Sequence, residues 1–285
     1  LDPTYYEVVV DGSLLRDTFI PLDLELGGSL IISDSQQSGL LNLETVWDDA
    51  LEARDFIGAR ILIDGLEALP DSSLDVDADS AFLTLRNIKF VGEGSRLHIN
   101  LSTDIHENNK IGYLKLLRST FSDLAQMTIN VEGCDFHMED GFFRNIKEMK
   151  VSVREGSSFL SDLSLDHIAS DNDETFKVAL NEGDTFEMRN VQVVGQSDDF
   201  LDLQVEEYGV GNEAIFTNIL LVDSTLGYFL NLDGSNDLPF HIRASHMTFN
   251  NVVSTELLEL DSNTTLSLEH SIFSNVVGGL SFVID

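Results

Sequence analysis

The sequence predicts an all-β solenoid, a single domain over residues 1–285 in which short strands stack coil upon coil. Three observations predict it: apolar and polar residues alternate along short segments, these segments recur at a nearly constant spacing, and hydrophobic residues make up 42% of the chain. Alternation with a period of two is typical of a strand with one buried face. Because a repeated unit of short strands cannot bury its apolar face by itself, successive units must stack.

The repeat is clearest near the C-terminal end. Residues 249–253 (FNNVV) recur 24 residues later as residues 273–277 (FSNVV). A second phrase occupies residues 201–204, 230–233 and 258–261, at spacings of 29 and 28 residues. With paired strands about 4.8 Å apart, a period of this size predicts roughly ten coils and a rod about 50 Å long. The drift of the period predicts connections of variable length within a constant frame.

Weaker copies of the alternating phrase lie upstream, at residues 22–26, 82–90, 127–131 and 149–153. We expect the inward Leu, Ile, Val and Phe side chains to form aligned ladders, with most of the 18 Phe residues in the interior. Asn recurs at turn positions, where its side chain caps backbone groups and tolerates the left-handed conformation.

One segment departs from this pattern. Apolar residues at three-to-four spacing between Leu43 and Leu51, with Gly58 beyond them, predict a short amphipathic helix near residues 43–56. Such a helix would cover an edge of the core and protect it from edge-to-edge pairing.

The phrase Leu266-x-Leu268-x-x-Ser271-x-Phe273-Ser274-Asn275 resembles the repeat of right-handed parallel β-helix proteins. These include autotransporter passengers, polymorphic outer-membrane proteins and the pectate-lyase-like superfamily. The resemblance covers most of the chain and implies a single-stranded right-handed parallel β-helix. It consists of fold-forming positions, and this fold hosts both enzymes and inert stalks.

The charge excludes some partners. Fifty acidic and 16 basic residues give a formal charge of −34. Binding to nucleic acid requires Lys and Arg to displace counterions, so we expect no nucleic-acid partner. Anionic membrane surfaces are disfavoured for the same reason, and no apolar run approaches the roughly 18 residues of a membrane span, so no membrane insertion is expected. The acidity instead fits a saline environment, bound cations or a basic partner.

Cysteine and histidine add little. Cys134, the single cysteine, is expected to be a buried and inert thiol. His241, His246 and His270 fall in the last two coils, where they could approach one another across stacked strands. A zinc site needs three or four ligands in fixed geometry, so surface or turn positions are the favoured interpretation of these residues.

Calcium is the cofactor that the acidic clusters suggest. Asp75, Asp77 and Asp79 are spaced like the first ligands of a calcium loop, but Ser80 and Arg86 replace the glycine and the bidentate Glu of an EF-hand, which excludes that motif. Asp171 and Asp173 could hold Ca²⁺ in a loop between strands. The alternative for both clusters is a solvated acidic face.

Polysaccharide cleavage is the enzymatic alternative. Asp198 and Asp199 resemble the paired aspartates of the polygalacturonase group, and Asp166-His167 resembles an Asp-His pair of pectate lyases. The resemblance implies Asp198, Asp199, Asp202 and His167 as catalytic candidates, with paired carboxylates protonating a leaving group and activating water. The Gly-His-Gly and Arg-x-Lys elements of the first group and the Arg-x-Pro-x-x-Arg element of the second are missing from the sequence.

The sequence therefore favours a non-enzymatic extracellular or cell-surface solenoid that acts as an adhesin, stalk or structural and assembly protein. A polysaccharide lyase or glycoside hydrolase is the alternative. The expected partner is a carbohydrate or protein surface, or a second copy of the chain that associates through the coil ends. The chain begins Leu-Asp-Pro without Met or a basic, apolar leader, so we expect a mature segment from which an export signal has been removed.

Overall fold

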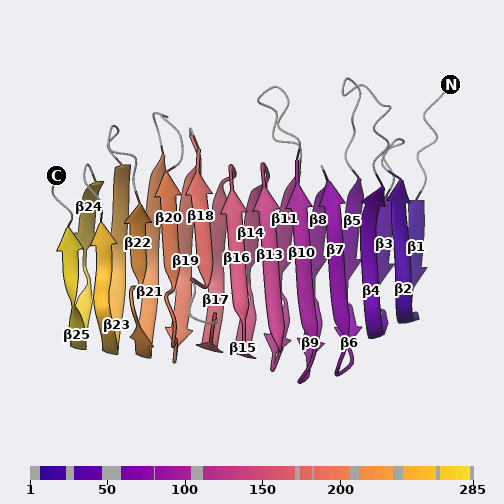
Figure 1. Cartoon of the computed structure of the whole chain (residues 1–285), viewed down its shortest axis with the longest axis horizontal. Coiled ribbons are helices and arrows are strands. Elements are labelled where there is room, and N and C mark those ends of the chain that lie inside the picture. Colours follow the sequence, from indigo (N-terminus) through magenta and orange to yellow (C-terminus); the bar gives the residue numbers. More distant parts are fainter. Residues whose placement is uncertain are drawn as a thin grey trace.

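The fold is a right-handed parallel β-solenoid, as the sequence predicted (Figure 1). The computed structural model describes residues 7–23, 29–46, 59–79, 81–103, 112–170, 174–181, 183–205, 212–233, 240–260 and 264–282. Every strand pair in this part of the chain is parallel, and each strand pairs with its counterparts one coil earlier and one coil later. The strands stack into three columns. The number of strands stacked in a column agrees with the expectation of roughly ten coils.

Column 1 contains β1 (Glu7–Asp11), β3 (Ser29–Ser33), β5 (Arg60–Asp64), β8 (Phe82–Arg86), β11 (Tyr113–Leu117) and β14 (Asp135–Glu139). It continues through the first parts of the long strands β17 (Ser158–Ile168), β19 (Thr185–Val194), β21 (Glu213–Leu226) and β23 (Phe240–Leu260), and then through β24 (Thr264–Glu269).

Column 2 is short. It begins with the first parts of β2 (Leu14–Asp23) and β4 (Gln36–Val46) and contains β6 (Glu67–Ala68), β9 (Lys89–Val91), β12 (Thr120–Ser122) and β15 (Phe142–Ile146). The last parts of β17 and β19, the middle parts of β21 and β23 and the start of β25 (Ile272–Phe282) complete it.

Column 3 follows the ends of β2 and β4 with β7 (Ser73–Asp79), β10 (Arg96–Ser102), β13 (Gln126–Glu132), β16 (Met149–Arg154), β18 (Phe176–Leu180), β20 (Leu201–Val205) and β22 (Leu230–Asp233), and closes with the ends of β23 and β25. Its strands run opposite to those of column 1, so their C-terminal ends line one long edge of the molecule, at the top of Figure 1.

The interior consists of the inward residues of these columns, and in most strands buried and less buried residues alternate. The inward row of column 2 includes a run of phenylalanines: the rings of Phe121 and Phe143 stack at 5.3 Å, and those of Phe249 and Phe273 stack at 5.1 Å. Phe200 and Phe229 stack at 5.2 Å next to this row. The expectation that most Phe residues are interior is confirmed for the described part of the chain, and Cys134 is buried as predicted.

The corner between columns 1 and 2, the first corner, has one residue per coil in the left-handed conformation. The series is Gly12, Asp34, Gly65, Asn87, Arg118, Asp140, Asp162, Asn190, Asn218, His246 and His270, with φ between 45° and 73°. Two residues separate the column 1 and column 2 strands in every coil from β1 to β15, so the bend is the same each time. Only glycine enters this region without cost, and Asn, Asp and His are the side chains that tolerate it best. The prediction of Asn at recurring turns is confirmed.

The predicted helix near residues 43–56 is wrong where it can be checked. Residues 43–46 belong to strand β4, in which Leu43 points inward and is fully buried. Leu41 and Leu43 alternate with polar residues. The pairing of this segment with β2 and β7 outweighs the helical spacing that begins at Leu43. Residues 47–56 lie outside the described residues. Among the described residues, none forms a helix that is long and apolar enough to span a bilayer.

Candidate functional site

The outward face of column 1 is the surface best suited to contact a ligand. Its central row contains one outward side chain from each coil, because the parallel register aligns equivalent positions at a spacing of about 4.8 Å. From β8 to β24 this row, which we call the track, reads Thr84, Lys115, His137, Phe159, Glu187, Ile215, Arg243 and Ser267. It combines aromatic, apolar, cationic and hydroxyl groups on an almost flat sheet.

Aromatic side chains gather in the middle of the track. His137 and Phe159 stack with ring centroids 4.8 Å apart. In the neighbouring outward row, Phe82 and Tyr113 meet edge to face at 5.3 Å, and the Lys115 ammonium lies 4.2 Å from the Tyr113 ring centroid. All five side chains are half-buried. Burial, followed by the positive charge of Lys115, lowers the pKa of His137, so this ring is neutral near pH 7.

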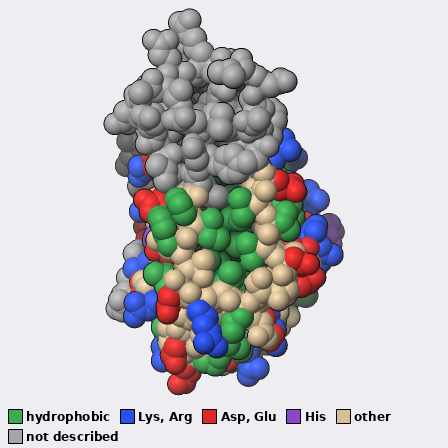
Figure 2. Space-filling view, turned by 90° about the vertical axis from the view of Figure 1, so that its right-hand side faces the viewer, with side chains coloured by type: hydrophobic (Ala, Val, Ile, Leu, Met, Phe, Trp, Pro, Cys, Tyr) green, Lys and Arg blue, Asp and Glu red, His purple; other side chains and the backbone are tan. Residues whose placement is uncertain are grey.

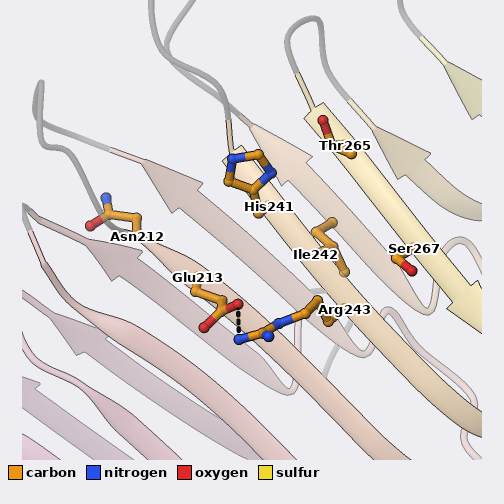
Figure 3. A pocket seen from close by; sticks show the side chains of 7 residues that line it. All are labelled: Asn212, Glu213, His241, Ile242, Arg243, Thr265 and Ser267. Atoms are coloured by element: carbon orange, nitrogen blue, oxygen red, sulfur yellow. Dashed lines mark ion pairs between the residues drawn. The ribbon is translucent and has the colours of Figure 1, made fainter.

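A shallow groove of about 380 Å³ lies farther along the same face, over β21, β23 and β24. Glu213 and Arg243 face one another between β21 and β23 and form an ion pair (Figure 3). The remaining walls come from Asn212, His241, Ile242, Thr265 and Ser267. A second hollow of about 340 Å³ adjoins the groove at Arg243 and Ser267. The face therefore offers hydroxyls, an amide and an imidazole around one paired guanidinium, a set suited to hydrogen bonding with a polar ligand.

The groove contains few groups for acid–base chemistry. Glu213, its one carboxylate among the described lining residues, is paired with Arg243. Hydrolysis of a glycosidic bond by the usual mechanism requires two carboxyl groups on opposite sides of the bond. The described lining of the groove therefore does not contain the pair of carboxyl groups that this mechanism uses.

The catalytic candidates from the sequence lie elsewhere, near the corner between columns 2 and 3. One oxygen of Asp198 accepts a hydrogen bond from the Ser170 amide at 2.8 Å, and Asp199 accepts one from the Tyr228 amide at 2.9 Å. His167 has a left-handed backbone at this second corner, and its exposed ring contacts Asp166 at 2.6 Å. Asp198 and Asp199 thus each join two successive coils through a backbone amide.

Asp202 is buried on β20, although it occupies an outward position. Asn231 and Gln204 donate hydrogen bonds to its two oxygens at 2.9 and 2.8 Å, and the Lys177 ammonium lies 3.6 Å away. Burial raises its pKa, and Lys177 followed by the two amides partly opposes that rise. The carboxylate is held by three donors and has only 4% of its side chain exposed, so its contacts link three successive coils.

A tyrosine–carboxylate pair lies one coil from Asp202. The Tyr228 hydroxyl donates a 2.7 Å hydrogen bond to Glu174. Burial, the hydrogen bond to Glu174 and the surrounding negative charges raise the pKa of Tyr228, which therefore stays protonated.

Of the calcium candidates, Asp75 and Asp77 point outward from β7. Asp77 accepts a 2.9 Å hydrogen bond from Asn100 of the next coil. The side chain of Asp79 and all of Asp171 and Asp173 lie outside the described residues. In the part of the chain that the structure describes, His, Cys, Asp and Glu side chains do not form a group of three or more that could hold a metal ion. Calcium binding at these clusters stays a prediction.

The track itself was not predicted from the sequence. Its signal is the parity of the strands: Leu83, Leu85, Leu114 and Leu116 point inward, which leaves Thr84 and Lys115 of the track, with Phe82 and Tyr113 beside them, outward. Which outward residues adjoin one another depends on the register between coils, and connections of unequal length hide that register. Comparison of the chain with protein-family models, with curated proteins and with solved structures gave no match.

Proposed function

We propose that this protein is a rigid, non-enzymatic rod of the adhesin, stalk or assembly type, located outside the cell or on its surface. The observation that carries the proposal is that outward polar side chains bond from coil to coil. Asn side chains donate to an acidic or amide side chain of the preceding coil in the pairs Asn87–Asp64, Asn100–Asp77, Asn145–Asp123, Asn190–Asp162, Asn218–Asn190, Asn231–Asp202 and Asn251–Asp223.

These bonds give many carboxylates a structural role. A general acid or base must be free to exchange a proton with the substrate. Asp198, Asp199 and Asp202 instead accept hydrogen bonds that join successive coils. Such bonds at the two corners and on column 3 stiffen a stack whose stability comes from contacts between neighbouring coils. This arrangement supports a mechanical or adhesive role.

The resemblance to autotransporter passengers and polymorphic outer-membrane proteins fits the same proposal, since they share the parallel β-helix architecture. The partner we favour is a carbohydrate or protein surface that lies along the track. Aromatic side chains such as Tyr113 and Phe159 supply contact area at low entropic cost, and the groove at Arg243 supplies hydrogen bonds.

The test has two parts. Purified protein incubated with acidic and neutral polysaccharides should release no new reducing ends or unsaturated products; depolymerisation of any of them would end the proposal. Binding to immobilised glycans and to cell-surface extracts should then fall for Tyr113→Ala and Phe159→Ala. Phe142→Ala is the matched control, because Phe142 points outward from column 2 and is 39% exposed.

A polysaccharide lyase or hydrolase is the second candidate. The raised pKa of buried Asp202 favours it, because strongly perturbed groups concentrate at functional sites. Asp199→Ala should then abolish cleavage of the substrate. Unchanged cleavage by this variant would remove Asp199 from the mechanism.

Assembly through the coil ends remains part of the first proposal. Among the described residues, large exposed hydrophobic side chains concentrate in the first and last coils: Val8, Val9, Leu14, Phe19, Leu268, Ile272, Phe273 and Val277. Figure 2 views the end with β1 and β2 and shows apolar side chains surrounded by charged ones. Light scattering over a range of protein and salt concentrations should reveal association, with high salt favouring it by screening the net charge of −34. A strict monomer under all conditions would exclude end-to-end assembly.

A further inference from the structure

Two imidazoles stack on the surface at the first corner. His246 of β23 and His270, between β24 and β25, occupy equivalent positions in successive coils, because Ser245 pairs with Glu269 just before them. Their ring centroids are 5.1 Å apart, and their planes differ by 11°. Both rings are exposed.

The corner fixes the backbone of both residues. The φ angles of His246 and His270 are 56° and 51°, so the two side chains leave the chain in the same direction. The Met247 amide donates to the Ser271 hydroxyl at 3.4 Å, which ties the two coils together next to the rings. The same corner carries Asn190 and Asn218 in the two preceding coils, where the Asn218 amide bonds to Asn190. The imidazoles therefore lie at the end of a side-chain ladder whose rungs already face one another.

The geometry points to a surface site at His246 and His270 that binds a divalent transition-metal ion, with copper(II) held most tightly. Imidazole nitrogen suits Cu²⁺, Ni²⁺ and Zn²⁺, and for a given nitrogen site Cu²⁺ binds most strongly of these ions. A metal–nitrogen distance of about 2.0–2.1 Å places two ligating nitrogens no more than about 4.2 Å apart. The two ring planes differ by only 11°, so the rings must turn about their side-chain torsions before both in-plane nitrogen lone pairs point at one ion, and both side chains are exposed and free to turn.

The rest of the protein supports cation binding at this place. A net charge of −34 raises the local concentration of cations near the surface. Two protein ligands leave the other coordination positions of the ion to water. Such a site is compatible with the described residues, among which no group of three or more potential ligands occurs. Ca²⁺ and Mg²⁺ require oxygen ligands and should not compete. A bound ion would link β23 to the segment from β24 to β25 and so fasten the last coil.

The experiment is titration of the full chain with Cu²⁺, and separately with Ca²⁺, by calorimetry and electron paramagnetic resonance. His246→Asn and His270→Asn are the test variants, because Asn occupies the same corner at Asn190 and Asn218 with a left-handed backbone. Loss of a supporting group near a metal typically weakens affinity about 10- to 100-fold, and loss of a ligand should cost at least as much.

His167→Asn and His241→Asn are the controls. His167 also has a left-handed backbone, but the corresponding residue of the next coil is Gly195, whose backbone lies against the His167 ring. We expect one Cu²⁺ per chain with nitrogen hyperfine structure from two imidazoles, lost in either test variant and kept in both controls. Amide exchange of β24 and the start of β25 should slow with Cu²⁺ in the wild type and stay unchanged in His270→Asn. Equal Cu²⁺ binding by the test variants and the wild type, or no binding by the wild type at micromolar Cu²⁺, would overturn the proposal.

Discussion

The left-handed residues of the first corner make a quantitative prediction at Asn218. Its φ is 57°, and its side-chain amide donates a 2.9 Å hydrogen bond to Asn190. Asn218→Ala loses that bond, at about 0.5–1.5 kcal/mol, and forces a Cβ-bearing residue without a local polar side chain into the left-handed region, at about 1–2 kcal/mol. The expected loss in free energy of unfolding is therefore about 1.5–3.5 kcal/mol.

Two further variants separate these contributions. Asn100 lies on an extended strand and donates an equivalent 2.9 Å bond to Asp77, so Asn100→Ala should cost only the hydrogen bond, about 0.5–1.5 kcal/mol. Asn218→Gly relieves the left-handed strain. However, the glycine raises the conformational entropy of the unfolded chain, which destabilises the folded state by about 0.4–1 kcal/mol. Its stability should therefore fall between those of the other two variants.

The measurement is urea unfolding followed by far-ultraviolet circular dichroism and by near-ultraviolet circular dichroism of the buried aromatic rings. Coincident transitions are required, because a solenoid can unfold from one end and a single free energy would then be undefined. The reasoning is refuted if Asn218→Ala costs no more than Asn100→Ala, or if Asn218→Gly is less stable than Asn218→Ala.

The remaining predictions concern the core and the ionisable groups. Phe143→Ala removes a fully buried, stacked ring and should cost about 3–5 kcal/mol in urea unfolding, whereas Phe142→Ala should cost far less; equal losses would contradict the assigned burial. Burial raises the pKa of Asp202 above its ordinary 3.8, so its stabilising contribution is present below that pH and lost as pH rises through the raised pKa. Asp202→Asn should flatten this part of the stability profile, and an unchanged profile would count against it. Asp64 has the opposite sign: a hydrogen bond from Arg86 lowers its pKa, so stabilisation is present above pH 3.8 and lost as pH falls through the lowered pKa. Arg86→Ala should reduce that acid-side loss and cost little stability at neutral pH, because the pair is at the surface; a large cost at neutral pH would contradict this.

The architecture could be predicted because burial and alternation are local properties. In residues 258–260 (LEL) and 266–268 (LSL) the parity states which side chains face inward, and stacking then follows from the repeat. The helix near residues 43–56 was predicted from spacing alone, and residues 43–46 are strand because pairing with neighbouring coils outweighs local preference.

The candidate site could not be predicted in the same way. Lys115 and His137 are 22 residues apart, Phe159 and Glu187 are 28 apart, and they adjoin only because connections of different length restore the same register. Asp198 and Asp199 stood out in the sequence as a pair of acids, yet their backbone hydrogen bonds depend on the position of the next or preceding coil. The sequence of one strand predicts which of its side chains point inward. It does not predict which residues of neighbouring coils lie next to one another.

The constant two-residue bend at the first corner also restricts how this chain can change in length. From β1 to β15 the connection from the column 1 strand to the column 2 strand is always two residues long. The connection from column 3 to column 1 varies instead: two residues separate β7 from β8, and ten separate β10 from β11. An added residue at the first corner would turn the side chains of the column 2 strand that follows it inside out. At the edge where column 3 meets column 1, the strand pairing between coils sets no fixed length for the connection. Insertions and deletions should therefore accumulate there. A foreign peptide inserted at that edge should leave the coils on either side in register.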